Sequence, residues 1–172
     1  KKFKFKKVRS TNNTAIRIIK KTNCKYGMVI SESQTNGKGQ YGRKWISHKG
    51  NLFVTFFHEV NKIKLSIATI TKLNCLLIKK LISKYTNKKI LYKKPNDLFI
   101  DKKKICGILQ EIIFMQNKKY LITGIGININ KSPYIKKCPT TNLNELTNKH
   151  IKIKEIEKSL KQIFENNLLK IY

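Results

Sequence analysis

The segment from Ser33 to Trp45 combines the residue types that hold an anion. Three glycines stand within six positions, and three cations and the only tryptophan of the chain accompany them. The glycines are Gly37, Gly39 and Gly42, and the cations are Lys38, Arg43 and Lys44. Glycine lets the backbone come close to a ligand, while lysine and arginine neutralise phosphate or carboxylate charge. The segment therefore predicts a mobile anion-binding loop, for which a solvated basic loop is the plain alternative.

Two common phosphate motifs do not fit this loop. The chain has no Gly-x-x-x-x-Gly-Lys-[Ser/Thr] run, and no apolar helix follows the Gly-x-Gly-x-x-Gly spacing as a dinucleotide-binding unit requires. A short turn and a strand follow instead.

Alternating and periodic apolar residues predict the elements that position this loop. Buried strands precede and follow it, at 26–31 and 51–57, and a long amphipathic helix is expected over 67–85. The other expected strands are 3–8, 90–92, 98–100, 105–113 and 121–130; a short helix follows the cap candidates at 10–14, 131–149 is loop-like, and a helix covers 156–168. Strands and helices mix without strict alternation, so we expect an α+β fold with helices packed mainly on one face of a mixed sheet.

Composition limits the classes of function. The formal net charge is +29, but only three of the 38 basic residues are arginine, which disfavours specific nucleic-acid recognition and favours acidic partners. A basic nucleic-acid-binding module stays a remote alternative. The four cysteines and three histidines are scattered, so neither a zinc site nor a redox dithiol is indicated. With no apolar run of membrane-spanning length and no signal peptide, we expect a cytoplasmic protein that does not enter the membrane.

Five motifs in one order resemble the catalytic domain of a biotin-protein ligase. They are Ser10-Thr11-Asn12; Gln34 with the Gly37–Trp45 loop; Lys93-x-Pro95-Asn96-Asp97-Leu98; Lys104-x-x-Gly107-Ile108-Leu109-x-Glu111; and Gly124-Ile125-Gly126-Ile127-Asn128. The resemblance covers about residues 8 to 130 and implies one class II synthetase-like catalytic domain over 1–172. We expect no helix-turn-helix domain before this domain, and we expect the small β-barrel that often follows it in the family to be absent.

The resemblance implies a two-step reaction. Biotin and MgATP form biotinyl-5'-AMP with release of pyrophosphate, and a specific lysine of a biotin carboxyl carrier domain then attacks the adenylate. Both substrates are anions at the reacting atoms, so the site must supply clustered cations and amide donors. Lys104, Arg43 and Asp97 are the implied catalytic residues, with Lys104 beside the biotin carboxylate and the α-phosphate.

The same resemblance distributes the binding roles. It implies contact with biotin from Ser10, Thr11, Asn12, Gln34, Gly37, Lys38, Gly39, Gln40, Trp45, Lys104 and Gly107. It implies contact with ATP or the adenylate from Lys38, Arg43, Asn96, Asp97, Lys104 and Asn128. Asp97 is the candidate Mg²⁺ ligand or base for the incoming lysine, Trp45 either covers the ligand or anchors the loop, and Gly124 and Gly126 serve packing. The loop is expected to be poorly ordered without biotin, because its closure excludes water from the adenylate.

Some positions depart from the family pattern. Lys38, Gln40 and Tyr41 stand where arginine is usual, and Lys94 replaces a tryptophan, so biotin affinity and adenylate retention could be weaker. A lipoate ligase or octanoyl transferase of the same superfamily is the nearest alternative function. A homodimer is compatible with the fold, and the sequence does not decide it.

Overall fold

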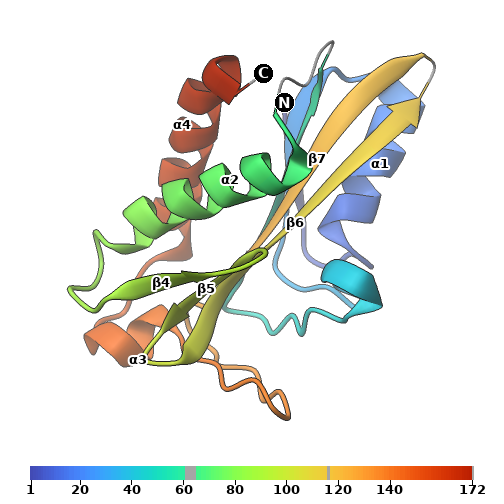
Figure 1. The fold of residues 1–172 in the computed structure, drawn as a ribbon. Coiled ribbons are helices and arrows are strands. Elements are labelled where there is room, and N and C mark those ends of the chain that lie inside the picture. The colour runs from blue at the N-terminus through green and yellow to red at the C-terminus, as the bar shows by residue number, and fades with distance from the viewer. Residues whose placement is uncertain (61–64, 116, 172) are drawn as a thin grey trace.

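The protein, seen here as a computed structural model that describes residues 1–60, 65–115 and 117–171, is built around one mixed sheet. The strands of the described residues lie in the order β1-β2-β3-β7-β6-β5-β4 (Figure 1). They are β1 (Lys2–Phe5), β2 (Tyr26–Ser31), β3 (Leu52–Glu59), β4 (Ile90–Lys93), β5 (Asp97–Ile100), β6 (Lys103–Met115) and β7 (Lys118–Ile127). β1 runs parallel to β2, and every other pair is antiparallel.

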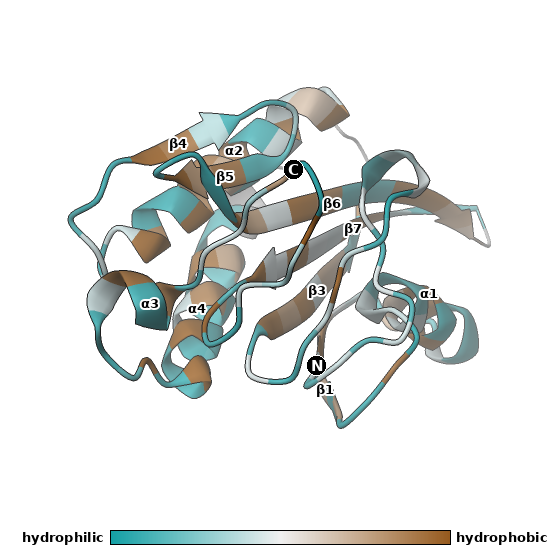
Figure 2. Ribbon diagram, turned by 90° about the horizontal axis from the view of Figure 1, so that it is seen from below, coloured by the Kyte–Doolittle hydropathy of each residue, from teal (hydrophilic) through white to brown (hydrophobic). Residues whose placement is uncertain are grey.

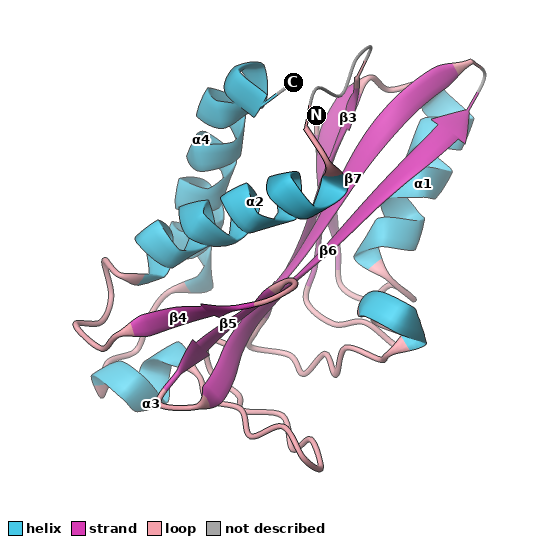
Figure 3. Cartoon of the chain, in the orientation of Figure 1, coloured by secondary structure: helices cyan, strands magenta, loops and turns pink. Residues whose placement is uncertain are grey.

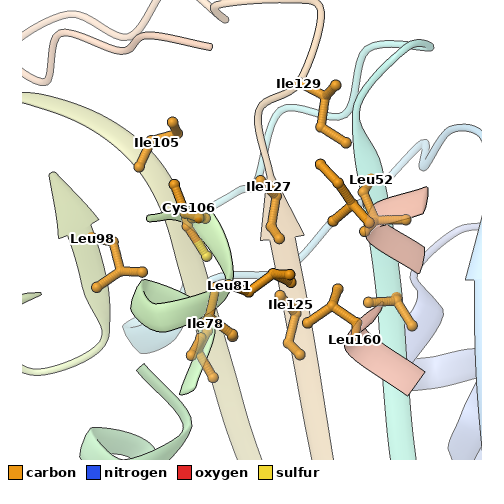
Figure 4. Close-up of a cluster of buried hydrophobic side chains, with 14 of the residues drawn as sticks. Leu52, Ile78, Leu81, Leu98, Ile105, Cys106, Ile125, Ile127, Ile129 and Leu160 are labelled. Atoms are coloured by element: carbon orange, nitrogen blue, oxygen red, sulfur yellow. The ribbon is translucent and has the colours of Figure 1, made fainter. Parts of the chain in front are cut away.

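Three long helices cover the sheet, and they are α1 (Thr11–Thr22), α2 (Ile67–Ile82) and α4 (Ile153–Ile171). Figure 3 shows α1 on one side of the sheet and α2 with α4 on the other. The expected α+β fold with helices mainly on one face is confirmed. On the side of α2 and α4, Ile78, Leu81 and Leu160 pack on Ile125 and Ile127 of β7 (Figure 4).

The hydropathy of the strands follows from their position. β3, β6 and β7 are mostly apolar where they cross the middle of the molecule, and the helices mix apolar and polar positions (Figure 2). Every residue of β3 from Leu52 to His58 is buried, because helices or loops cover both faces. Burial of each leucine, valine or phenylalanine side chain of this strand contributes about 1.5–3 kcal/mol relative to leaving it exposed.

One expected boundary is settled and another is corrected. Among the cap candidates at 10–14, Ser10 caps α1, because its side chain accepts a hydrogen bond from the Asn13 amide at 3.4 Å, and the helix begins at Thr11. The segment 131–149, expected to be loop, contains α3 (Leu143–Thr147), whose first turn is capped by Asn142. A five-residue helix is too short to show a helical period in sequence.

The face that α1 covers is covered only in part. Ala15 and Ile19 of α1 pack on Phe57, Tyr120 and Ile122, which lie toward one end of β3 and β7. Toward the other end, the strands β6 and β7 carry glycines on this face, and the basic loop lies over them. The candidate site forms there.

Candidate active site

A cavity of about 780 Å³ opens on the α1 side of the sheet. The first turn of α1, the basic loop, the β4–β5 turn, the start of β6, the end of β7 and the segment 135–138 all contribute to its wall. Six segments of the chain thus meet at one place.

Glycines make the floor of the cavity flat. Gly107 of β6 and Gly126 of β7 are paired across the sheet, and the indole of Trp45 lies on both. A Cβ atom added to Gly107 or Gly126 would stand 2.6 or 2.4 Å from the indole. A Cβ atom on Gly124 would stand 2.2 Å from Oδ1 of Asn12. The expected packing role of Gly124 and Gly126 is confirmed, and Trp45 both anchors the loop and forms part of the wall.

The basic loop folds back on itself above this floor. The Trp45 amide donates to the Gly37 carbonyl at 2.9 Å, and the Gly39 amide donates to the Arg43 carbonyl at 2.7 Å. A single 3₁₀ turn (Gln40–Gly42) forms its tip, with Tyr41 in the left-handed region at φ 54°. These bonds hold the exposed side chains of Lys38 and Arg43 at the mouth of the cavity. The ordering of the loop by biotin stays a prediction.

A β-bulge aims Lys104 into the cavity. Phe99 pairs with Lys104 and Leu98 pairs with Cys106, so Ile105 is the extra residue of β6. Ile105 and Cys106 consequently both face the core on the side of α2, while Lys104 and Gly107 both face the cavity. Without the bulge, the strict alternation of a strand would turn Lys104 and Gly107 to opposite faces.

Lys104 forms a partly buried ion pair at the centre of the site. Its Nζ atom lies 2.7 Å from Oδ2 of Asp97, and the two side chains are 16% and 19% exposed. The same Nζ atom lies 5.1 Å from the centre of the Trp45 ring. The backbone of Lys104 is fixed as well, because it pairs with Pro139 and Thr141 of the following loop. In this poorly solvated position the charge of Lys104 acts strongly on a nearby anion.

Three buried polar atoms around the cavity have no hydrogen-bond partner among the described residues. They are Oδ1 of Asp97, Nε1 of Trp45 and Oε1 of Gln40. Buried polar groups are normally paired, and an orphan group needs a reason. All three residues line the cavity, so a polar ligand there would meet two acceptors and one donor.

The first turn of α1 is tied to the loop through Gln34. Oε1 of Gln34 accepts from both the amide and the hydroxyl of Thr11, at 2.7 and 3.1 Å. Nε2 of Gln34 donates to the Ser47 hydroxyl at 2.9 Å. Ser10, Thr11 and Gln34 therefore lie together on the wall, as the resemblance implies, and Gln34 also fixes the position of Thr11.

The side chain of Asn12 is used within the protein. Its Nδ2 donates to Glu111 at 2.6 Å, and its Oδ1 accepts from the Thr55 hydroxyl at 2.6 Å. Asn12 is 3% exposed, so in this structure it supports the floor beneath the cavity. Glu111 and Thr55 are partners that sequence reasoning missed as supporting residues.

Two expected binding residues do not line the cavity. Gly37 is buried within the loop, where a Cβ atom would meet the Trp45 carbonyl oxygen at 2.4 Å. Asn128 is 1% exposed, accepts from Asn51 at 3.3 Å and donates to the Lys104 carbonyl at 3.4 Å. The contact of Asn128 with adenine stays a prediction, and its contacts here stabilise the segment that follows β7.

Comparison with known proteins agrees with this geometry. The model of the biotin/lipoate A/B protein ligase family matches residues 4–128, which is most of the chain. The chain belongs to this family. It is 29% identical over 126 residues to the bifunctional ligase/repressor BirA of Bacillus subtilis, and 29% identical over 102 residues to BirA of Escherichia coli. These matches cover 72% and 58% of this chain and 39% and 32% of the relatives, so the chain spans well under half the length of either.

Solved structures of the family share the fold over nearly the whole chain. The biotin protein ligase of Aquifex aeolicus in complex with biotin and ATP is 30% identical with a TM-score of 0.80, covering 98% of this chain and 70% of that one. The Leishmania major enzyme in complex with biotinyl-5-AMP is 25% identical with a TM-score of 0.80, covering 94% and 72%. A lipoate complex of Plasmodium falciparum LipL1, at 15% identity and a TM-score of 0.58, shares the fold alone.

Sequence reasoning did not show how many cations surround the site of this ligase-family chain. Besides Lys38, Arg43 and Lys104, the cavity is lined by Lys44, Lys93, Lys94, Lys136 and Lys137. Cys138 and Phe99 also line it. A pair of adjacent lysines carries no signal in a chain with 38 basic residues. The segment 135–138 was considered loop only, and its closeness to Lys104 comes from the pairing of Lys104 with Pro139.

Proposed function

We propose that the chain is the catalytic domain of a biotin-protein ligase. It activates biotin with ATP to biotinyl-5'-AMP and transfers the biotinyl group to a lysine of a biotin carboxyl carrier domain. The observation that carries this proposal is the convergence of Lys104, the loop cations and three orphan polar atoms over a glycine floor. The match of residues 4–128 to the ligase family supports it.

The chemistry explains why the cations converge. An oxygen of the biotin carboxylate bonds to the α-phosphorus of ATP, and the bond from that phosphorus to the pyrophosphate oxygen breaks. Negative charge concentrates around the phosphorus as the two anions approach, and a fixed cation lowers this barrier. Lys104 is fixed by Asp97 and Trp45, whereas Lys38 and Arg43 come from the loop that folds over the floor.

The residues also fit a magnesium ion bound together with the nucleotide. Mg²⁺ is usually held by one or two carboxylates together with substrate phosphates, and keeps several waters. Asp97 is the single carboxylate among the described residues that line the cavity, and its buried Oδ1 has no partner there. In the described part of the chain no cluster of three or more His, Cys, Asp or Glu could hold a metal by itself. Asp97 would hold the ion, which would supply charge neutralisation at the phosphates.

The proposal extends to partners and compartment. The acceptor would be the carrier domain of a biotin-dependent carboxylase such as acetyl-CoA carboxylase, in the cytoplasm, with a homodimer as a further option. No described helix is both long and apolar enough to cross a lipid bilayer.

Biotin-dependent exchange of labelled pyrophosphate into ATP tests the first step. We expect exchange in the unaltered chain and a loss of about 10²–10³-fold in Lys104→Ala, the scale typical for removal of one preorganised charge donor. Lys103→Ala is the matched control, because Lys103 is the exposed neighbour on the same strand and does not line the cavity.

Two results would contradict the proposal. Exchange that starts with lipoate and not with biotin would assign the lipoate branch of the family. Equal exchange in Lys104→Ala and Lys103→Ala would remove Lys104 from its role.

A further inference from the structure

The wall of the cavity carries a large excess of positive charge, and the proposed substrates neutralise this charge only in part. Eight of the lining side chains are cationic, and Asp97 is the one carboxylate among the described lining residues. The cationic side chains are Lys38, Lys44, Lys93, Lys94, Lys104, Lys136, Lys137 and Arg43. Asp97 is already paired with Lys104.

The charge balance changes between the two steps of the proposed reaction. ATP and biotin bring several negative charges, which offset the cations nearest the reacting atoms while both are bound. Once pyrophosphate has left, the adenylate keeps the single negative charge of its phosphate. The site is therefore strongly positive again when the acceptor must arrive, and the acceptor lysine is itself a cation that such a site repels.

Three of the cations lie where they can attract carboxylates of the acceptor protein and so offset the repulsion of its lysine. Lys94, Lys136 and Lys137, here called the rim lysines, are exposed, and no ion pair among the described residues involves them. Lys94 stands in the β4–β5 turn, which is held to β6 because the Ile108 amide donates to the Asn96 carbonyl at 3.0 Å. Lys136 and Lys137 lie shortly before Pro139, whose carbonyl accepts a hydrogen bond from the Lys104 amide at 2.8 Å. The two segments thus flank the start of β6 on either side of Lys104.

We propose that the rim lysines form the docking surface for an acidic face of the acceptor protein. This inference rests on the proposed function. Carboxylates beside the target lysine of the acceptor would pair with the rim lysines, offset the repulsion and bring the amine to the adenylate. There the ammonium loses one proton to solvent, the resulting amine nitrogen bonds to the biotin carbonyl carbon, and the bond from that carbon to the phosphate oxygen breaks. AMP leaves, and the second proton of the nitrogen passes to solvent as the amide forms. Charges at such a rim act mainly on the rate of association, by about 10–10³-fold.

Separate assays of the two steps test the proposal. The variant Lys94→Gln/Lys136→Gln/Lys137→Gln is compared with Lys72→Gln/Lys80→Gln/Lys158→Gln, which removes the same charge from exposed positions on α2 and α4, across the sheet from the cavity. The probes are biotin-dependent pyrophosphate exchange, transfer to hydroxylamine, and transfer to a recombinant biotin carboxyl carrier domain with Asp and Glu beside its target lysine. A second carrier domain has these residues changed to Asn and Gln.

We expect the rim variant to keep exchange and transfer to hydroxylamine within about twofold, because neither needs a docked protein. Its kcat/KM for the acidic carrier falls about tenfold or more, while the α2/α4 variant loses much less. The neutralised carrier is a poor substrate for the unaltered chain, and the rim variant makes it little worse.

Three outcomes would overturn the docking surface. Exchange that falls as far as carrier transfer would assign the rim lysines to the nucleotide. Equal losses in the two triple variants would leave only the overall charge as the cause. A rim variant that keeps carrier transfer but loses binding to single-stranded DNA at about 150 mM salt would mark a nucleic-acid surface. Failure of the proposed function has a different signature, because the unaltered chain would then show no biotin-dependent exchange.

Discussion

Single glycines decide how closely Trp45 can approach the sheet. Gly107 and Gly126 leave the surface of β6 and β7 without side chains over the area that the indole covers. The centre of the ring lies 5.1 Å from Nζ of Lys104, a distance typical for a cation–π contact. One methyl group on the floor would therefore displace the indole and, through it, the ammonium of Lys104.

Gly126→Ala tests this contact. The added Cβ would stand 2.4 Å from a rigid ring, and we expect a loss of about 1–3 kcal/mol in the free energy of unfolding together with a raised KM for biotin. In a Trp45→Ala background the same change should cost little, because the ring is gone. Gly39→Ala is the control for stability, since its Cβ would meet nothing closer than 3.4 Å.

Equal losses from Gly126→Ala with and without Trp45 would show that the indole does not set the constraint. Thermal unfolding of the four members of this double-mutant cycle gives the answer.

For single residues, the sequence predicts which side chains gather at the candidate site better than it predicts the contacts that each of them makes. Lys104, Asp97, Arg43, Gln34 and the Ser10–Asn12 turn do gather around one cavity. The bulge at Ile105 could not be seen in sequence, because it depends on the register between β5 and β6. The hydrogen bonds of Asn128 with Asn51 and of Asn12 with Glu111 could not be seen in sequence either, because they join residues that only the tertiary fold brings together.

Strand β3 is the element that ties the two halves of the sheet together. It pairs with β2 on one side and with β7 on the other. Its run of apolar residues by itself predicts a central strand. His58 is the titratable residue in this buried run, at 7% exposure, and Thr55 is its other polar residue. Burial lowers the pKa of His58 from 6.5 to about 4, because the charged imidazole loses its hydration there.

His58 should make the fold sensitive to mild acid. The unfolded chain binds a proton at this residue below about pH 6.5 while the folded chain stays neutral until about pH 4, so stability falls as the pH falls through this window. We expect a loss of about 2 kcal/mol between pH 7.5 and pH 5, and a smaller loss in His58→Gln. Urea unfolding at several pH values measures it.

Histidines on the surface supply the control. His48→Gln/His150→Gln changes two exposed side chains and should keep the acid sensitivity of the unaltered chain. The same slope in His58→Gln would show that other groups cause the loss.

The elements themselves were largely predictable where they are long and apolar. The strand expected at 26–31 is β2 without change, and the long helix expected from residue 67 is α2. The start of α1 was predicted only as a set of cap candidates, of which Ser10 is the cap, and α3 with its Asn142 cap was missed. In both cases a side-chain hydrogen bond, and not an apolar period, sets the boundary.

The whole molecule carries a formal charge of +29, which repels itself in the compact state. The ion pairs of the described residues use few of these cations, and most of the lysines face solvent unpaired. Screening by salt should therefore stabilise the fold.

We expect the melting temperature to rise by about 3–6 °C between about 50 and 300 mM NaCl, as the screening length drops to about half. KCl should act equally, because the effect is one of ionic strength. A melting temperature that stays constant or falls would mean that favourable ion pairs outweigh the repulsion. Binding to DNA or RNA that disappears over the same range of salt would be a consequence of charge alone.

The position of Trp45 gives the protein an optical reporter of its own active site. It is the only tryptophan in the chain, so its emission is not mixed with that of another indole. Its ring rests on the cavity floor, with an unpartnered Nε1 and a lysine ammonium close by. Any ligand that enters must change the polarity and the charge around this one fluorophore. The proposed binding of biotin, of the nucleotide and of their analogues can thus be tested by intrinsic fluorescence on the unlabelled protein, separately from the proposed catalysis.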